Sequence, residues 1–163
     1  MTPRMAQIGD AAAIAAIYNE GIADRIATFE TELRSAEQIA IWFDKRHPLV
    51  VVEGDGGVLA FASSSPYRDR ACYAGIAGFS VYVARRHRGT GAGRVALAAL
   101  IDAATQAGFW KLVSRIFPEN TASLVLMARM GFRQVGVYQR HGRLDGQWRD
   151  CIIVERLLGA AAV

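Results

Sequence analysis

Apolar and polar residues follow two different periods along the chain, and residues 10–45 follow the helical one. Asp10 precedes an apolar pattern that predicts a helix to about Tyr18, with the aspartate as its N-cap. After a polar stretch, Ser35 and Gln38 form a capping-box pattern, because a serine is followed three residues later by a glutamine. This pattern predicts a second helix to about Lys45.

The period changes at residue 49, where a β-branched run begins. Leu49–Glu53 and Val58–Ala62 flank the turn residues Gly54–Gly57, and a glycine-rich turn between two apolar runs predicts a β-hairpin. Residues 63–71 are expected to form a loop, and a long strand is expected from about 73 to 83.

The rest of the chain alternates between helices and strands. Four apolar residues at i, i+3, i+4 and i+7 predict an amphipathic helix over about 91–107: Leu97, Leu100, Ile101 and Ala104. Further elements are expected as a strand at 111–117, a helix at 120–130, and strands at 132–140 and 148–157. With an opening strand, the order is β-α-α-β-β-β-α-β-α-β-β. Hairpins and one βαβ crossover indicate a single α/β (α+β) domain over 1–163, with a mixed, mostly antiparallel twisted sheet of about seven strands and helices on both faces.

Composition narrows the class of protein. Hydrophobic residues make up 52% and charged residues 21%, a balance typical of a folded globular domain. Apolar runs stay shorter than the roughly 18 residues of a membrane helix, and the N-terminus lacks a signal-peptide pattern, so a soluble cytoplasmic protein is expected. Cys72 and Cys151 lack CxxC spacing, and His47, His87 and His141 lack ligand spacing, so no metal site is expected.

The net charge of +4 is unevenly distributed. Arg85, Arg86, Arg88 and Arg94 crowd one short segment around His87. A local basic cluster indicates a polyanionic partner, either nucleic acid or a phosphorylated cofactor.

Glycines within this segment favour the cofactor. An apolar strand runs into a loop with Gly89, Gly91 and Gly93, and a helix follows directly. Residues without Cβ let a phosphate approach the backbone, whose amides and helix N-terminus then bind it. The dinucleotide fingerprint requires glycine at 94, where the chain has Arg94, and the Walker A pattern is absent.

The spacing Arg88-x-x-Gly91-x-Gly93 resembles the acetyl-CoA motif (Q/R)-x-x-G-x-(G/A) of the GNAT superfamily of N-acetyltransferases. Asn120-x-x-Ser123, followed by a helix that ends at Gly131-Phe132, resembles the second motif of that superfamily. The resemblance implies the GNAT fold and acetyl-CoA as cosubstrate. It implies these cofactor-binding residues: Val81, Val83, Arg88, Gly89, Gly91, Gly93, Arg94, Asn120 and Ser123. Asn120 is equally a candidate helix N-cap.

Longer stretches are similar to phosphinothricin acetyltransferases, from about residue 4 to 157, and especially to the enzymes that acetylate arsinothricin. The similar stretches include IYNE (17–20), TFETE (28–32), SPYR (65–68), SVYV (80–83), FWKLVSRIFPEN (109–120) and RHGRLDG (140–146). The resemblance implies transfer of an acetyl group to the α-amine of a glutamate-like amino acid, and a homodimer. It points to Phe29, Arg68, Arg70 and Tyr73 as substrate-binding residues, although a solvated loop with local ion pairs also accounts for 68–70.

Two positions depart from the pattern. Gly78 stands where the family often has a general-base Glu, and Met127 stands where the superfamily often has a Tyr acid. Glu30, Glu32 or Asp69 acting through water, and Tyr138 as an acid, are candidate substitutes, with the strand amide near Val81 stabilising the oxyanion. Gly78 equally suits a β-bulge.

These departures keep other functions open. They include an acetyltransferase for another amino acid such as methionine sulfoximine, or for a different small amine. A third function is a catalytically weak acyl-CoA-binding module, in which Gly78 records lost chemistry. A nucleic-acid-binding module fits less well, because the basic residues gather around a phosphate loop instead of spreading over a surface.

Overall fold

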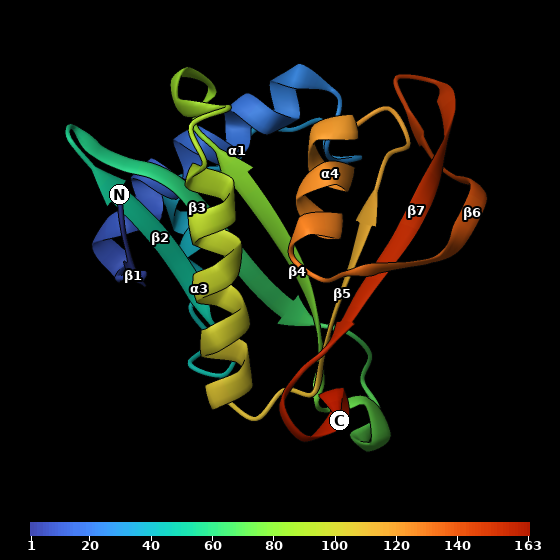
Figure 1. Ribbon diagram of the computed structural model, residues 1–163. Coiled ribbons are helices and arrows are strands. Elements are labelled where there is room, and N and C mark those ends of the chain that lie inside the picture. Colours follow the sequence, from blue (N-terminus) through green and yellow to red (C-terminus); the bar gives the residue numbers. More distant parts are fainter.

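The computed structural model describes residues 1–163 and contains one seven-stranded sheet and four α-helices (Figure 1). The strands are β1 (Thr2–Met5), β2 (Leu49–Gly54), β3 (Gly57–Pro66), β4 (Ile76–Val83), β5 (Lys111–Ile116), β6 (Arg133–Leu144) and β7 (Gln147–Leu157). The helices are α1 (Ala11–Asp24), α2 (Ala36–Ala40), α3 (Ala92–Gln106) and α4 (Thr121–Arg129). The expected order of strands and helices is confirmed.

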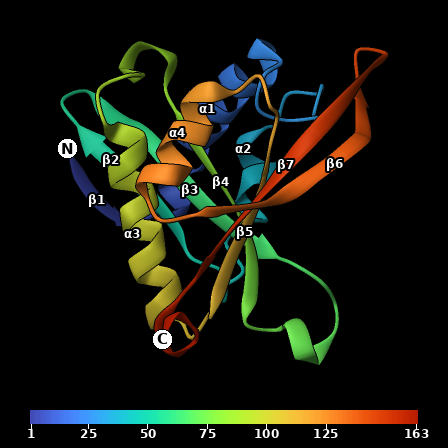
Figure 2. The ribbon, with the colours of Figure 1, turned by 45° about the vertical axis from the view of Figure 1, so that its right-hand side comes forward.

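The sheet runs in the order β1-β2-β3-β4-β5-β7-β6, and only the β4–β5 pair is parallel. Helices α3 and α4 cover one face and α1 and α2 the other, so the mixed, mostly antiparallel sheet with helices on both faces is as expected (Figures 1 and 2).

Alternation along β2 and β3 divides the core between these two faces. Val50 and Val52 belong to the larger cluster under α3, whereas Val51 packs with α1 and α2. Both clusters contain fully buried large side chains, Leu97 in the first and Ile14 in the second. Truncating such a side chain to alanine typically costs about 2–5 kcal/mol of stability.

Several element boundaries differ from the expected ones. Helix α1 continues past Tyr18 to Asp24 through Gly21, because the glycine makes room for Tyr82: a Cβ there would lie 2.6 Å from the Tyr82 ring. Helix α2 ends early, at Ala40. Strand β3 continues to Pro66, where a loop was expected from 63, since β4 supplies partners along that whole length.

The N-terminus of α1 is held differently from the expected cap. Asp10 occupies the N-cap position of α1, but its side chain does not cap that helix. Its carboxylate accepts hydrogen bonds from Arg4 at 2.7 and 2.9 Å and from the Gln7 amide at 2.8 Å. Arg4 also pairs with Glu53 at 2.6 Å, so these contacts join β1, α1 and β2. The hydrogen bond from Arg4 lowers the pKa of Asp10 despite partial burial.

We expect Asp10→Asn to lower the free energy of unfolding by about 1 kcal/mol at pH 7, since charged hydrogen bonds are lost. A depressed carboxyl pKa stabilises the fold above the unfolded-state value and loses that effect as pH falls through the folded value. The difference from the parent should therefore shrink below about pH 4. Urea unfolding at several pH values measures it, with Asp55→Asn in the exposed β2–β3 turn as control. A pH-independent difference would contradict this assignment.

Candidate functional site

The centre of the sheet splits between β4 and β5. The two strands pair only over Ile76–Gly78 and Lys111–Val113, and then diverge as Figure 1 shows. The diverging strands leave a wedge-shaped opening between them, which we call the wedge. At its apex the Ser114 hydroxyl donates to the Phe79 carbonyl at 2.9 Å. Strand alternation therefore turns the backbone groups of Val81 and Val83 into the opening, away from β3. An extended ligand can bind these groups as an added strand would.

The wedge leads to a glycine loop at the start of α3. Gly89 and Gly91 have φ values of 76° and 91°, which side-chain-bearing residues rarely adopt. Gly91 is the N-cap of the fifteen-residue helix α3, so no side chain satisfies the first-turn amides. A Cβ at Gly93 would approach Val83 within 3.2 Å, so this glycine lets helix and strand pack closely. This arrangement offers backbone N–H groups of the kind that can bind a pyrophosphate.

Two arginines of the loop are held by the last turn of α1. Arg85 and Arg88 each pair with Asp24 at 2.7 Å, and Glu20 accepts from the Arg85 amide at 2.6 Å. Burial opposes ionisation of Asp24, but the two guanidinium groups outweigh it and lower the pKa of the carboxyl. The Arg88 side chain is therefore directed toward α1, whereas Arg94 is exposed at the start of α3.

Helix α4 lies beside the wedge on the α3 side (Figure 1). The Asn120 side chain accepts from the Ser123 amide at 3.3 Å, so the N-cap interpretation of Asn120 is confirmed. Met127 is 4% exposed and packs in the main core, which accounts for an apolar residue there.

Behind the wedge, the opposite face of the sheet is partly open and carries serines. Ser65 is directly opposite Gly78 and Ser63 is opposite Ser80, so all four residues share the face of Phe61. Ser80 is exposed although β4 is an interior strand. The β3–β4 register is unbroken, so the bulge interpretation of Gly78 is wrong. A Cβ at Gly78 would lie 3.2 Å from the Ser65 hydroxyl, leaving room for a side chain after a small adjustment.

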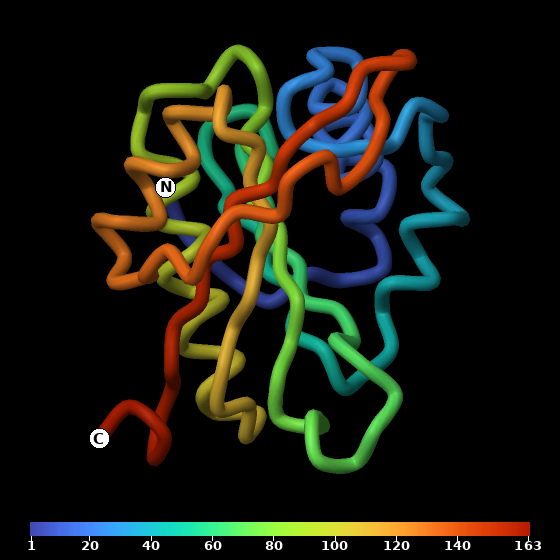
Figure 3. The backbone as a smooth tube through the Cα atoms, turned by 90° about the vertical axis from the view of Figure 1, so that its right-hand side faces the viewer, coloured from blue at the N-terminus to red at the C-terminus, as the bar shows by residue number.

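Phe29 forms a wall of this face. Its ring packs on Phe117 at 4.9 Å, and a Cβ at Gly142 would lie 2.7 Å from it, so β6 needs a glycine there. Arg25 pairs with Asp145 at 3.0 Å and joins the same loop to the β6–β7 turn, and Figure 3 shows these segments side by side.

The other expected substrate residues lie on the loop between β3 and β4, at the opposite end of β4 from the glycine loop (Figure 2). Arg68 lies over the Tyr67 ring at 5.5 Å and Arg70 over the Tyr73 ring at 5.9 Å. Neither arginine forms an ion pair with Asp69, so local ion pairs do not account for the segment.

The candidate acids and bases remain on separate elements. Glu30 is paired with Arg34 at 2.8 Å, and Glu32 and Asp69 are exposed on two different loops. Tyr138 lies on β6, half-exposed against the His141 ring at 4.7 Å. The structure does not bring these candidates together.

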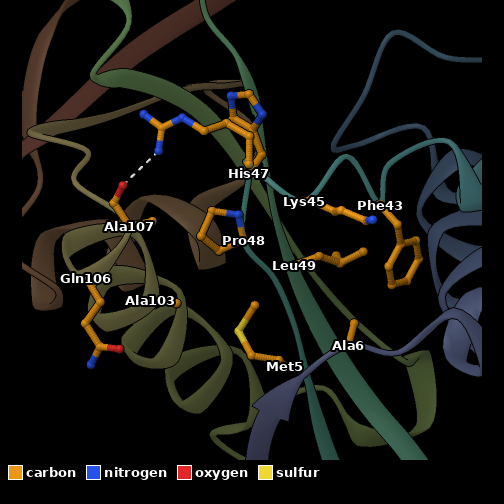
Figure 4. Close-up of a pocket in the computed structure, with 11 residues that line it drawn as sticks. Met5, Ala6, Phe43, Lys45, His47, Pro48, Leu49, Ala103, Gln106 and Ala107 are labelled. Atoms are coloured by element: carbon orange, nitrogen blue, oxygen red, sulfur yellow. Dashed lines mark hydrogen bonds between the residues drawn. The ribbon is translucent and has the colours of Figure 1, made fainter.

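A separate hollow of about 570 Å³ lies away from the wedge, between β1, β2 and the C-terminal end of α3 (Figure 4). Its Arg46 side chain has structural partners, since it donates to the Ala107 carbonyl at 2.8 Å and covers Phe109 at 3.9 Å. No group of three or more His, Cys, Asp or Glu side chains is arranged to hold a metal ion. No helix is long and apolar enough to span a membrane.

A strand wedge joined to a phosphate-binding glycine loop defines an acyl-CoA-dependent transferase, and comparisons specify the family. The acetyltransferase (GNAT) family profile matches residues 14–132. Phosphinothricin N-acetyltransferase of Alcaligenes faecalis is 36% identical, over 98% of this chain and 83% of that protein. The L-methionine sulfoximine/L-methionine sulfone acetyltransferase of Salmonella typhimurium is 31% identical, over 95% of this chain and 93% of that protein.

The fold agrees with these relatives. The structure of a GNAT phosphinothricin acetyltransferase from Sinorhizobium meliloti, in complex with acetyl-CoA, matches with a TM-score of 0.89 and 29% identity. The match covers 97% of this chain and 88% of that one. This chain belongs to the GNAT acetyltransferase family, and the expected family, fold and enzyme class are confirmed.

We expect Gly91→Ala to weaken acetyl-CoA binding about tenfold. A Cβ at φ 91° is strained by roughly 1–2 kcal/mol, and relief of that strain displaces the amides of the loop. Gly108→Ala is the matched control, because Gly108 has φ 90° at the other end of α3 and a Cβ there would meet no atom within 4 Å. Calorimetric titration with acetyl-CoA compares them. Equal affinity losses in both variants would show that the loop has no special part in binding.

Proposed function

We propose that the chain transfers the acetyl group of acetyl-CoA to the α-amine of a glutamate-like amino acid, phosphinothricin or arsinothricin. The observation that carries this proposal is the continuity of the glycine loop, the wedge and the open serine-lined face. A cofactor that enters by the loop reaches the apex at Gly78 and Phe79, where the opposite face is open to an acceptor.

Each part of the cofactor has a counterpart in the chain. The amides of Gly89–Gly93 bind the pyrophosphate, and Arg94 adds charge at the helix start. Val81 and Val83 offer backbone partners to the extended arm, with Asn120 and Ser123 on the α4 side. For Arg88 to reach the phosphates, its guanidinium must leave Asp24, so the backbone is the principal anion site of the loop.

Acetyl-CoA supplies a thioester whose carbonyl carbon the amine nitrogen attacks. The Val81 amide stabilises the developing oxyanion, the C–S bond breaks, and the thiolate takes up a proton. Orientation in the wedge lowers the barrier by several kcal/mol. A peptide α-amine is roughly a tenth neutral at pH 7 and a free amino acid less so, and with glycine at 78 the ammonium proton passes to water.

The substrate class is supported by the relatives and by charge. Arg68 and Arg70 have no acidic partner, and guanidinium groups suit an oxyacid such as a phosphinate. The Salmonella relative, named for methionine sulfoximine and methionine sulfone, favours a second candidate substrate with a neutral tetrahedral group. An acyl-CoA-binding module without turnover is the remaining alternative, and the experiment below tests it.

We also propose a homodimer in the cytoplasm, where acetyl-CoA is available. Val135, Val137 and Tyr138 are about half exposed on β6, which is an edge strand of the sheet. Exposed apolar residues on an edge strand are suited to pairing with a second chain.

The test is thiol release from acetyl-CoA with L-phosphinothricin, L-arsinothricin and L-methionine sulfone. We expect activity in the parent that rises with pH as the amine loses its proton. Gly78→Glu should raise kcat at pH 7 by about 10²-fold, because the carboxylate replaces water as base.

Gly78→Gln is the matched control, with the same size and no basic group. Equal rates for the Glu and Gln variants would show that Gly78 is not the place of a missing base. Acetyl-CoA binding without thiol release in the parent and in Gly78→Glu would leave only the binding module.

A further inference from the structure

Arg115 is an unpaired arginine in the interior of the sheet. It lies on β5, which is flanked by β4 and β7, yet the residue is exposed. Its guanidinium forms no hydrogen bond or ion pair within the chain. An exposed arginine on an interior strand means that no helix covers this part of the face.

The face on which Arg115 lies is the acceptor face. Val113 on β5 and Phe117 just after the end of β5 lie two residues to either side of Arg115, and both pack in the cluster that contains Phe29. Gly78 pairs with Val113, so Ser80 and Arg115 occupy equivalent positions on the two strands, just past the point where pairing stops. Arg115 and the exposed Ser80 therefore flank the wedge where the thioester carbonyl must lie.

The charge of Arg115 is not neutralised by a neighbouring acid. No carboxylate forms an ion pair with it: Glu30 pairs with Arg34, Glu119 with Arg149, and Glu155 with Lys111 and Arg133, while Asp150 accepts a hydrogen bond from the Arg140 amide. The guanidinium lies close enough to the Cys151 thiol to affect its pKa. Burial raises the pKa of this thiol, and the positive charge of Arg115 partly lowers it again. An unpaired guanidinium beside a reaction centre is a ready anion site.

We infer that Arg115 is a specificity-determining residue that binds the α-carboxylate of the amino-acid acceptor. The inference rests on the proposed function. The carboxylate is attached to the same carbon atom as the reacting amine, so its partner must lie at the wedge, as Arg115 does. Arg68 and Arg70, the residues proposed for the distal oxyacid, lie on a different segment, the loop beyond the end of β3. The two anionic groups of the substrate thus have separate partners.

The test compares amino acids with amines that lack only the carboxyl group. L-Methionine sulfone and its decarboxylated amine have the same neutral side chain, so a difference between them reports on the carboxylate. Arg115→Gln should raise KM for L-methionine sulfone about 10- to 100-fold and leave KM for the amine and for acetyl-CoA within about twofold. Arg115→Lys should show a smaller rise in KM, because lysine keeps the positive charge but lacks the planar guanidinium that binds a carboxylate through two hydrogen bonds.

Arg129→Gln is the matched control, since Arg129 is an exposed and unpaired arginine on α4. It should leave all of these constants unchanged, and thermal unfolding of each variant checks the fold. Equal losses with the amino acid and the amine would overturn the inference. So would a loss seen with phosphinothricin but not with methionine sulfone, because Arg115 would then bind the oxyacid.

A binding measurement separates this inference from the proposed function. If the parent transfers no acetyl group, L-methionine sulfone is titrated calorimetrically into protein saturated with desulfo-CoA, which cannot react. Binding to the parent that is lost in Arg115→Gln would support the carboxylate site while the proposed transfer fails. Equal binding by the parent and Arg115→Gln, or no binding by the parent, would overturn the inference that Arg115 binds the carboxylate.

Discussion

The structure depends on the point where β4 and β5 stop pairing. Parallel hydrogen bonds join the strands as far as Gly78 and Val113, and the Ser114 hydroxyl then donates to the Phe79 carbonyl. Beyond this apex the backbone of β4 has a strand partner on only one side, and on its open side only the Val83 carbonyl accepts a hydrogen bond, from Arg88 at 3.4 Å. An interior strand with unpaired amides would be costly if it stayed buried and dry, so the wedge is a place that a ligand completes. The glycine loop and α4 both take their functional meaning from their position beside it.

The last turn of α1 links the two halves of the site. Asp24 holds Arg85 and Arg88 beside the glycine loop, while the next residue, Arg25, turns into the left-handed region and pairs with Asp145 on the β6–β7 turn. The adjacent residues Asp24 and Arg25 therefore position the glycine loop and the β6–β7 turn, respectively. These ion pairs are partly exposed, so each adds little stability by itself, and their importance is geometric.

The acceptor face, the open face of the sheet that carries Ser65, Gly78 and Ser80, has one position without a side chain, Gly78. Gly78 leaves a space beside the Ser65 hydroxyl, and Ser80 adds a second hydroxyl to the same open surface. No carboxylate replaces the glycine at this point of the surface, which is why the proposed mechanism passes the ammonium proton to water. Arg115 is an unpaired charge on this face, and the proposed recognition of the acceptor carboxylate depends on it.

The amino-acid sequence was enough to predict the order of the elements, the glycine loop and the Asn120 cap, since these depend on residues close together in the chain. Family resemblance added the cofactor and the substrate class. Other features became visible only in the folded chain. These features are the unbroken β3–β4 register at Gly78, the continuation of α1 through Gly21, and the exposure of Arg115. Periodicity could not reveal these, because each depends on a partner distant in the sequence: β3 for Gly78, Tyr82 for Gly21, and an uncovered stretch of sheet for Arg115.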